Sequence, residues 1–194
     1  MNKFTEFRLP MIDADASAPY LAAMTVRPIL TLPDARLRQK SQPVAAFDGE
    51  LEQLIVDMFE TMYKAPGIGL AAIQIGVARR VVTVDLARKN EPPAPQAFIN
   101  PHILAASDEV VGYEEGCLSI PEYYGEIERP ARITVAFQDM KGNAHQVEAD
   151  GLLATVLQHE IDHLDGVLFI DHMSRLKRQL VIKKFAKAAR QAEK

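Results

Sequence analysis

Residues Gln158-His159-Glu160-Ile161-Asp162-His163-Leu164 contain an HExxH pattern. On an α-helix, residues i and i+4 lie about 40° apart around the axis, so the imidazoles of His159 and His163 can reach one metal ion. Glu160 projects near the same ion and can act on a bound water without binding the metal itself. The pattern favours a metal-dependent enzyme and requires a third protein ligand from elsewhere.

The residues before the pattern strengthen the metal hypothesis. Leu152-Leu153-Ala154-Thr155-Val156-Leu157 is nearly all apolar, which predicts a largely buried helix that begins at Gly151 and ends near Leu164. Buried imidazoles need partners, and a metal ion satisfies two of them at once. The alternative is a helix whose histidines and glutamate simply face solvent.

The only cysteine, Cys117, lies upstream in Glu114-Glu115-Gly116-Cys117-Leu118-Ser119-Ile120-Pro121. A lone cysteine is most often an inert small core residue. Against that reading, Gly116 lets the backbone approach another group closely, and Pro121 stiffens the exit from the segment. One thiolate and two imidazoles give three protein ligands and leave the fourth tetrahedral position for water, as a catalytic site requires.

A third segment, Gly67-Ile68-Gly69-Leu70-Ala71-Ala72-Ile73-Gln74, combines glycines with small side chains. It differs from a phosphate-binding loop because it follows a predicted helix and lacks the Lys-Ser/Thr ending. Small residues suit a backbone edge that receives an extended peptide. Gln74 offers an amide donor to a carbonyl oxygen that gains negative charge.

Composition sets the class of protein. The 194 residues, of which 48% are hydrophobic, suffice for one well-packed domain. No apolar run is long enough to span a bilayer, and the acidic residues Glu6, Asp13 and Asp15 argue against a transit peptide. One cysteine cannot form an internal disulfide, which favours a reducing compartment. We expect a soluble, cytoplasmic protein with no membrane or DNA partner.

The net charge of −4 conceals an asymmetry between the body and the C-terminus. Residues 174–194 contain eight Lys and Arg against one Glu, whereas residues 1–173 contain 14 against 25 Asp and Glu. The basic segment has helical spacing, with Ser174 as its N-cap and Leu176, Leu180 and Phe185 among the basic residues. Two readings stay open: a solvated helix docked by its apolar side, or a basic handle for an anionic partner such as RNA.

The order of the predicted elements indicates the fold class. Asp48 caps a strong amphipathic helix, and Asn100-Pro101 ends one of the predicted strands. The strands lie at residues 81–84, 97–99, 133–137 and 146–149, the last two forming a hairpin. Since strands and helices do not alternate, we expect an α+β fold, with short mixed or antiparallel sheets around the central HExxH helix and a C-terminal helix.

The three segments together resemble the signatures of the peptide deformylases: a GxGxAAxQ loop, an EGCLS segment and a QHExDHLxG helix. The likeness includes residues 29–38, residues 168–171 and Ser174, and covers roughly residues 26–190. It implies a catalytic domain at residues 26–173, preceded by an extension at residues 1–25 and followed by a basic helix at residues 174–194.

Such a family removes the formyl group from the N-terminal formylmethionine of nascent polypeptides and releases formate. The resemblance implies that Cys117, His159 and His163 bind one divalent metal ion, typically iron(II) in cells, with zinc, nickel or cobalt as substitutes in purified protein. Water activated by the ion attacks the formyl carbon. In bacterial members a basic terminal helix can dock on the ribosome, which adds weight to the second reading of residues 174–194.

The resemblance also implies roles for residues beside the metal. Glu160 takes the proton of the attacking water and delivers it to the leaving amine. Gln74 and the backbone N–H of Leu118 stabilise the oxyanion. The remaining expected substrate contacts pair with the peptide backbone or form an apolar pocket for methionine: Ile68, Gly69, Leu118, Leu152 and Val156.

Three positions near this pocket differ from the family pattern. Tyr113 and Thr155 stand where aliphatic residues are common, and the stretch containing Tyr124 lacks an arginine of some bacterial members.

Two other functions compete with deformylation. An HExxH peptidase requires a downstream ligand, but neither Asp165 nor Asp171 falls at a familiar spacing. A silent peptide-binding relative should have lost a ligand or the base, and all are present.

Overall fold

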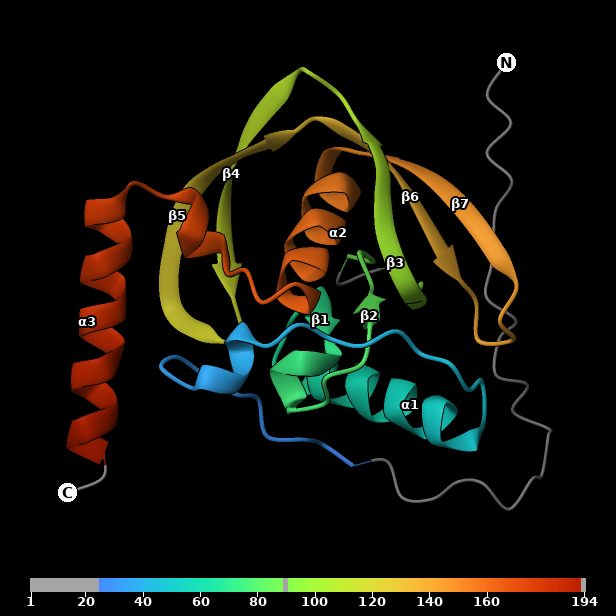
Figure 1. Cartoon of the computed structure of the whole chain (residues 1–194), viewed down its shortest axis with the longest axis horizontal. Helices are drawn as coiled ribbons and strands as arrows, with labels where there is room; N and C mark the ends of the chain where they lie inside the picture. The colour runs from blue at the N-terminus through green and yellow to red at the C-terminus, as the bar shows by residue number, and fades with distance from the viewer. Residues whose placement is uncertain (1–24, 89–90, 193–194) are drawn as a thin grey trace.

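The computed structural model describes residues 25–88 and 91–192. The predicted extension at residues 1–25 therefore lies almost entirely outside the described residues. Three α-helices, seven strands and three short 3₁₀ helices occur among the residues described (Figure 1). In chain order they are η1 (Ala35–Arg38), α1 (Gly49–Lys64), β1 (Gly69–Ala71), η2 (Ala72–Ile75), β2 (Val81–Val84), β3 (Gln96–Ala106), β4 (Val110–Cys117), β5 (Ile120–Pro130), β6 (Arg132–Gln138), β7 (Ala144–Asp150), α2 (Gly151–Leu164), η3 (Phe169–His172) and α3 (Arg175–Ala192).

Two antiparallel sheets enclose helix α2. Five strands pair in the order β1-β2-β3-β6-β7, and β4 pairs with β5 in a separate two-stranded sheet. Figure 1 shows α2 between them, at the centre of the molecule. The predicted α+β fold around a central HExxH helix is confirmed, and β4 and β5 are strands that the sequence reading did not predict.

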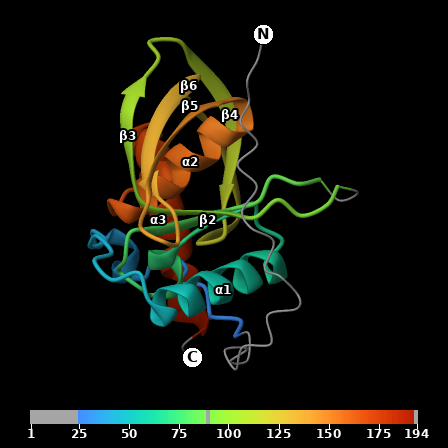
Figure 2. The same cartoon turned by 90° about the vertical axis from the view of Figure 1, so that its right-hand side faces the viewer.

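Strand β2 holds the middle of the core because both of its faces are covered. All four of its residues are buried. Val82 and Val84 pack in a cluster with α2, whereas Val81 packs in a cluster with α1. Figure 2 shows the two helices on opposite sides of β2. A strand buried on both faces has a continuous apolar sequence, which explains the run Val-Val-Thr-Val.

Helix α1 forms where its periodicity predicts. The carboxylate of Asp48 accepts hydrogen bonds from the backbone N–H groups of Glu50 and Leu51, so it caps the first turn. The apolar side of the helix packs under the sheet. The hairpin predicted at residues 133–149 is also confirmed, as strands β6 and β7.

The prediction that a strand ends at Asn100-Pro101 is wrong, because β3 continues to Ala106. The ladder with β6 shifts register between Ile99 and His102, so these residues form a bulge within the strand. Asn100 has a φ of 52° and its side chain bonds the backbone of Val44, which holds this bulge in place. A bulge accommodates a proline that an uninterrupted ladder would exclude.

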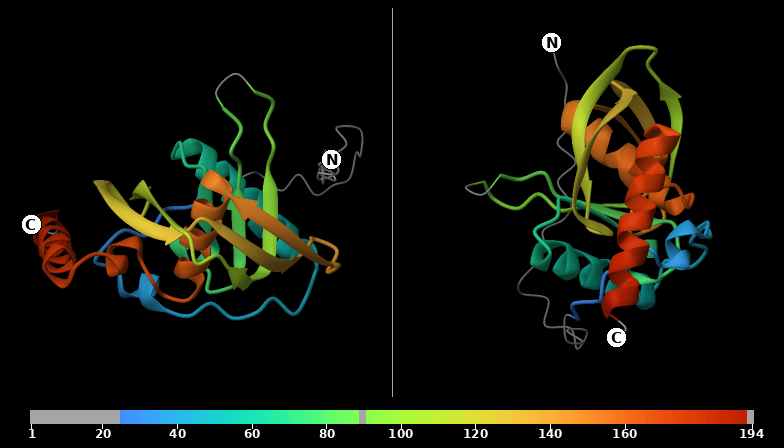
Figure 3. Two further views of the ribbon diagram at one scale, coloured as in Figure 1. Left: turned by 90° about the horizontal axis from the view of Figure 1, so that it is seen from above. Right: turned by 90° about the vertical axis from the view of Figure 1, so that its left-hand side faces the viewer.

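The basic C-terminal helix exists, and of the three apolar residues predicted on it, Phe185 packs on the body whereas Leu176 and Leu180 do not. Figures 1 and 3 show α3 at one edge of the molecule, beyond η3. Val181 is 2% exposed and Phe185 packs against the same cluster. Leu176 and Leu180 are 69% and 60% exposed, so they do not dock the helix.

No helix in the described part of the chain is long and apolar enough to cross a membrane.

Candidate metal and catalytic site

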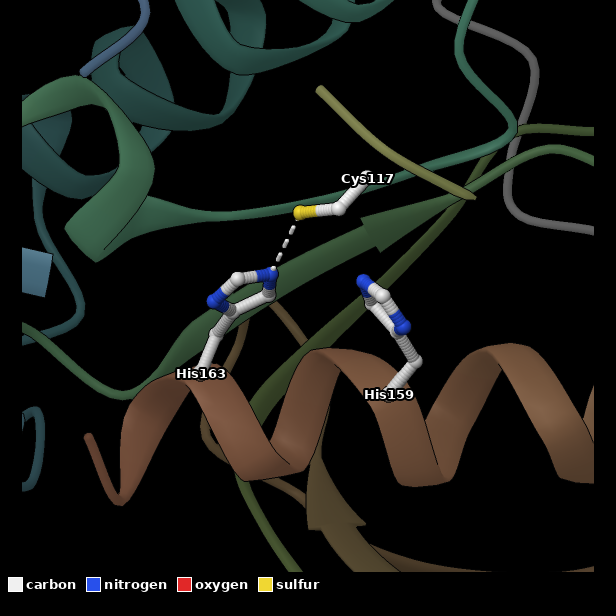
Figure 4. Close-up of side chains that lie close together, drawn as sticks. All are labelled: Cys117, His159 and His163. Atoms are coloured by element: carbon white, nitrogen blue, oxygen red, sulfur yellow. Dashed lines mark hydrogen bonds between the residues drawn. The ribbon is translucent and has the colours of Figure 1, made fainter. Parts of the chain in front are cut away.

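The structure brings the three predicted metal ligands together. His159 and His163 lie one turn apart on α2, and Cys117 ends strand β4 above them (Figure 4). One donor atom from each residue lies within 4.8 Å of the other two. The sulfur of Cys117 is 3.2 Å from Nε2 of His163. Such spacing suits atoms that share one ion at bond lengths of about 2.0–2.3 Å.

A buried ion pair fixes the orientation of His159. Its Nδ1 is 2.8 Å from a carboxylate oxygen of Glu115, so Nε2 is the nitrogen that faces the other ligands. Arg129 donates two hydrogen bonds to Glu115, of 2.5 and 3.1 Å, and one of 2.8 Å to Asp162. Burial raises the pKa of Glu115, but the hydrogen bonds from His159 and Arg129 hold it below its usual value. The carboxylate is therefore charged at neutral pH.

The electrostatics of the two histidines suit metal ligation. Burial, together with the charge of His159, lowers the pKa of His163 well below its usual value and keeps its imidazole neutral. Burial lowers the pKa of His159 too, but Cys117 and Glu115 raise it well above its usual value. An ion bound at Nε2 would take the place of that second proton.

Glu160 faces the same space without a fixed partner. Its side chain is buried, and Oε2 has no hydrogen-bond partner among the described residues. Burial raises the pKa of Glu160 to about 7. A carboxyl group with such a pKa can accept and return a proton near neutral pH.

The backbone of β1 approaches Glu160 closely because residue 69 is glycine. A Cβ atom at Gly69 would lie 2.5 Å from a carboxylate oxygen of Glu160 and 2.9 Å from Val156. β1 is also one of the two edge strands of its sheet. Any larger residue would push the edge away from α2, so this glycine sets the width of the site.

Gln74 and Leu118 border Cys117 from two sides. The Gln74 side chain accepts a hydrogen bond from the N–H of Ala71, and its amide nitrogen lies 3.1 Å from Oγ of Ser119 and 3.6 Å from the sulfur of Cys117. Leu118 begins the turn between β4 and β5, and its side chain covers Gly67. Both residues thus lie beside the expected metal position.

A cavity of about 550 Å³ opens in front of these residues. Its lining includes every residue predicted from the sequence to contact substrate, and it includes Tyr113, Tyr124 and Thr155. Val156 is buried deep in the wall, whereas Ile68 and Leu152 are 43% and 45% exposed. The predicted contacts on the wall are Ile68, Gly69, Leu118, Leu152 and Val156.

The polar residues behind His159 were not predicted from the sequence. Glu115 lies two residues before Cys117 on a strand, so both side chains face α2, and this spacing was a usable signal. Arg129 offered none, because it pairs with Val111 in the ladder, and whether its side chain reaches Glu115 depends on the register of β4 with β5. His172, which bonds Asp162 at 2.8 Å, depends likewise on the path of the chain after α2.

The donor set fits a divalent metal ion of borderline softness. A thiolate and two imidazoles are ligands for zinc and for the neighbouring transition metals. The Nδ1 of His159 is held by Glu115, which leaves its Nε2 for an ion, and the Nε2 of His163 already faces the sulfur of Cys117 at 3.2 Å. The three residues could therefore bind one ion.

The chain matches known proteins over most of its length. A family model described as polypeptide deformylase matches residues 26–179. The chain is 62% identical to the peptide deformylase of Agrobacterium fabrum over 86% of this chain and 98% of that one. It is 59% identical to the peptide deformylase of Brucella suis over 87% of this chain and 96% of that one.

The solved structures that resemble this chain are also peptide deformylases. The crystal structure of a peptide deformylase from Legionella pneumophila is 45% identical, has a TM-score of 0.78 and covers 88% of this chain and 99% of its own. The peptide deformylase from Ehrlichia chaffeensis in complex with actinonin is 43% identical, has a TM-score of 0.80 and covers 85% and 98%. The chain therefore belongs to the polypeptide deformylase family, metal-dependent hydrolases that remove the formyl group from nascent peptides.

Proposed function

We propose that this chain carries out deformylation in the 550 Å³ cavity, with Cys117, His159 and His163 as the ligands of one divalent metal ion. The convergence of these three donor atoms within 4.8 Å is the observation that carries the proposal. When bound, the ion supplies Lewis-acid chemistry, since it polarises a carbonyl oxygen and lowers the pKa of water.

Glu160 is the proposed general base and acid. Its unpartnered oxygen is free to take the proton from the attacking water and then to give it to the amine that leaves. Neither Arg129 nor another cation among the described residues hydrogen-bonds this carboxylate, so a proton can reach it without first breaking an ion pair. Glu115 keeps His159 in the tautomer that a ligand needs.

Gln74 and the N–H of Leu118 are the proposed donors to the formyl oxygen. The Gln74 amide is held by Ala71 and Ser119, and such a preorganised donor does not need to reorient during the reaction. The peptide backbone would add to the free edge of β1 at Ile68 and Gly69. The methionine side chain would pack against Val156 on the apolar wall.

Iron(II) is the proposed ion in cells, although the Irving–Williams order gives zinc the higher affinity for such a site. Which metal is bound then depends on which metals the cell supplies. The single unpaired cysteine favours a reducing compartment such as the cytoplasm. Air should inactivate the iron(II) form because a solvent-facing thiolate ligand is open to oxidation. Metal analysis of protein purified with and without air tests this assignment.

The exposed basic residues of α3 support a second proposal, docking on the ribosome. Lys183, Lys187 and Arg190 lie on one side of the helix, away from Val181, and all three are exposed. Such a surface suits the phosphates of RNA. Docking there would bring the cavity close to emerging nascent chains.

The test of the catalytic proposal is formate release from formyl-Met-Ala by anaerobically purified, iron(II)-loaded protein. The matched variant is Glu160→Gln, which keeps the shape of the side chain and should lower kcat about 10²- to 10⁴-fold. The metal content of both proteins should be equal. Equal rates for the two, or no release with either iron(II) or nickel(II), would contradict the proposal.

A further inference from the structure

A buried carboxylate lies behind the wall of the cavity, apart from the metal ligands and Glu160. Asp85 follows directly after β2, is only 6% exposed and does not line the cavity. Burial of a carboxylate costs free energy unless hydrogen bonds or a cation compensate it. The donors that surround Asp85 therefore show which parts of the molecule this residue holds together.

The side chain of Asp85 joins α1 to the connection between β2 and β3. It accepts a hydrogen bond of 2.7 Å from the hydroxyl of Tyr63, in the last turn of α1. Burial and the hydrogen bond to Asp85 raise the pKa of Tyr63, so the hydroxyl keeps the proton that it donates. Asp85 also accepts hydrogen bonds from the N–H groups of Ala87 and Ala94, in the two arms of a connection that projects from the body of the molecule (Figure 2).

The backbone of Asp85 holds the start of β1. Its N–H donates a hydrogen bond of 3.0 Å to the carbonyl oxygen of Ile68, directly before that strand. Asp85 thus fastens both ends of residues 63–68, since its side chain holds Tyr63 and its backbone holds Ile68. Residues 65–68 of this segment line the cavity. Displacement of Asp85 should therefore move this part of the cavity wall.

The bond to Ile68 also determines where the polar backbone groups of Gly69 point. In an antiparallel ladder, residue pairs that exchange hydrogen bonds alternate with pairs that do not. Ile68 bonds Asp85, and the next pair along the ladder is Gly69 with Val84. Gly69 therefore belongs to a pair without hydrogen bonds, and its N–H and C=O point away from β2, toward the free edge of β1.

We propose that Asp85 is a positioning residue for the peptide chain of the substrate, because its hold on Ile68 directs the N–H and C=O of Gly69 toward that chain. The inference rests on the proposed function, in which the peptide adds to the free edge of β1. A chain that joins a sheet edge binds through main-chain hydrogen bonds, which form only if the edge is aligned. Since Asp85 lies outside the cavity, it should affect binding of the peptide and not the chemical step.

The expected effect follows from the two hydrogen bonds that Gly69 can offer. Each backbone hydrogen bond changes a binding equilibrium about two- to tenfold. Tyr63→Phe removes one donor to Asp85, and KM should rise about threefold. Asp85→Ala removes the whole carboxylate, and KM should rise about tenfold or more. In both variants kcat should change less than about twofold, because the lost contact is with a part of the substrate that does not react.

The experiment measures kcat and KM for formyl-Met-Ala-Ala amide with the iron(II)-loaded full chain. The variants are Tyr63→Phe and Asp85→Ala. The matched control is Asp57→Ala, because Asp57 is a buried carboxylate of α1 that accepts hydrogen bonds from Arg27 and Gln53 and does not line the cavity. The control should leave both constants unchanged. Metal content and thermal unfolding of each protein are measured alongside.

Three outcomes overturn the inference. An unchanged KM in both test variants would show that Asp85 does not align the edge. A lower kcat with an unchanged KM would assign the residue to the chemical step instead of peptide binding. An equal rise of KM in Asp57→Ala would show that lost stability, and not the edge of β1, changes KM.

The exposed Tyr63 keeps the test decisive if Asp85→Ala does not fold. Tyr63 is 45% exposed, so loss of its hydroxyl should leave the fold intact, and an unchanged KM in Tyr63→Phe then overturns the inference alone. Deformylation by the wild type separates this inference from the proposed function. An active wild type whose variants keep its KM contradicts the role of Asp85 only, whereas a wild type that releases no formate contradicts both.

Discussion

Helices α2 and α3 both carry polar side chains at regular helical spacing, yet they place them in opposite environments. On α2, His159, Glu160 and His163 are buried. On α3, the basic side chains other than the half-buried Arg178 are exposed, and Val181 is the buried residue among those whose burial is described. Burying a polar group costs free energy unless a partner satisfies it, so the polar face of α2 needs a ligand and that of α3 does not. Polar side chains on α2 therefore indicate a ligand-binding site, whereas those on α3 indicate a solvent-exposed surface.

Loss of a metal ligand should have the largest effect. Cys117→Ala removes the one ligand that comes from outside α2, so the ion should no longer be retained and formate release should fall by more than about 10³-fold. Metal content after gel filtration and formate release measure this. The exposed control, Leu180→Ala on α3, should retain both. Full metal occupancy in Cys117→Ala would show that the buried histidines of α2 do not need Cys117 to bind the ion, which would contradict the proposed site.

The ion pair behind α2 should have the next largest effect, on stability. Arg129→Met leaves the buried Glu115 and the half-buried Asp162 with less compensation and should cost about 3–5 kcal/mol in the free energy of unfolding. Urea denaturation of the metal-free protein measures this. The matched control is Arg132→Met, whose exposed ion pair with Glu109 should be worth less than about 1 kcal/mol. Equal losses in the free energy of unfolding of the two variants would show that the burial of an ion pair does not determine its contribution to stability.

Two neighbouring apolar residues sharpen the comparison within α3. Val181→Ala should lower the free energy of unfolding by about 1.5–2.5 kcal/mol, since it removes buried groups from the cluster around Phe169. Leu180→Ala should change it by less than about 0.5 kcal/mol because Leu180 is largely exposed. Thermal and urea unfolding measure both changes. A larger loss in Leu180→Ala than in Val181→Ala would show that the helix docks by its leucines instead.

The charges of α3 should have the smallest effect and none on chemistry. Lys183→Glu with Lys187→Glu should weaken co-sedimentation with ribosomes about tenfold and leave deformylation of short peptides unchanged. The control Lys40→Glu with Lys141→Glu makes the same change of charge at exposed positions away from α3. Ribosome binding that is insensitive to both pairs would remove the docking proposal.

Much of the site could be predicted from the sequence because its parts are local. The spacing of His159 and His163 on a helix, and the segment around Cys117, each indicate a ligand without knowledge of the fold. The helices and the hairpin of β6 and β7 follow from periodicity for the same reason. Where a prediction depended on one breaker residue, as at Asn100, a bulge in the tertiary structure changed the outcome.

The rest depends on contacts between distant strands. Arg129 reaches Glu115 only because β4 and β5 pair in one register, and no local pattern encodes that register. The docked side of α3 was equally hidden, since Val181 and Leu180 are both apolar and only the position of η3 decides which one is covered. Residues of this kind need a structure to be assigned.

The most direct test of the metal site is X-ray absorption spectroscopy of the iron(II)-loaded protein. We predict one sulfur and two imidazole nitrogens in the first coordination sphere of wild type, the same set in Glu160→Gln, and loss of the sulfur in Cys117→Ser. A spectrum without sulfur in the wild type, or one in which Glu160→Gln removes a protein ligand, would contradict the assignment of Cys117, His159 and His163 as ligands and of Glu160 as the base.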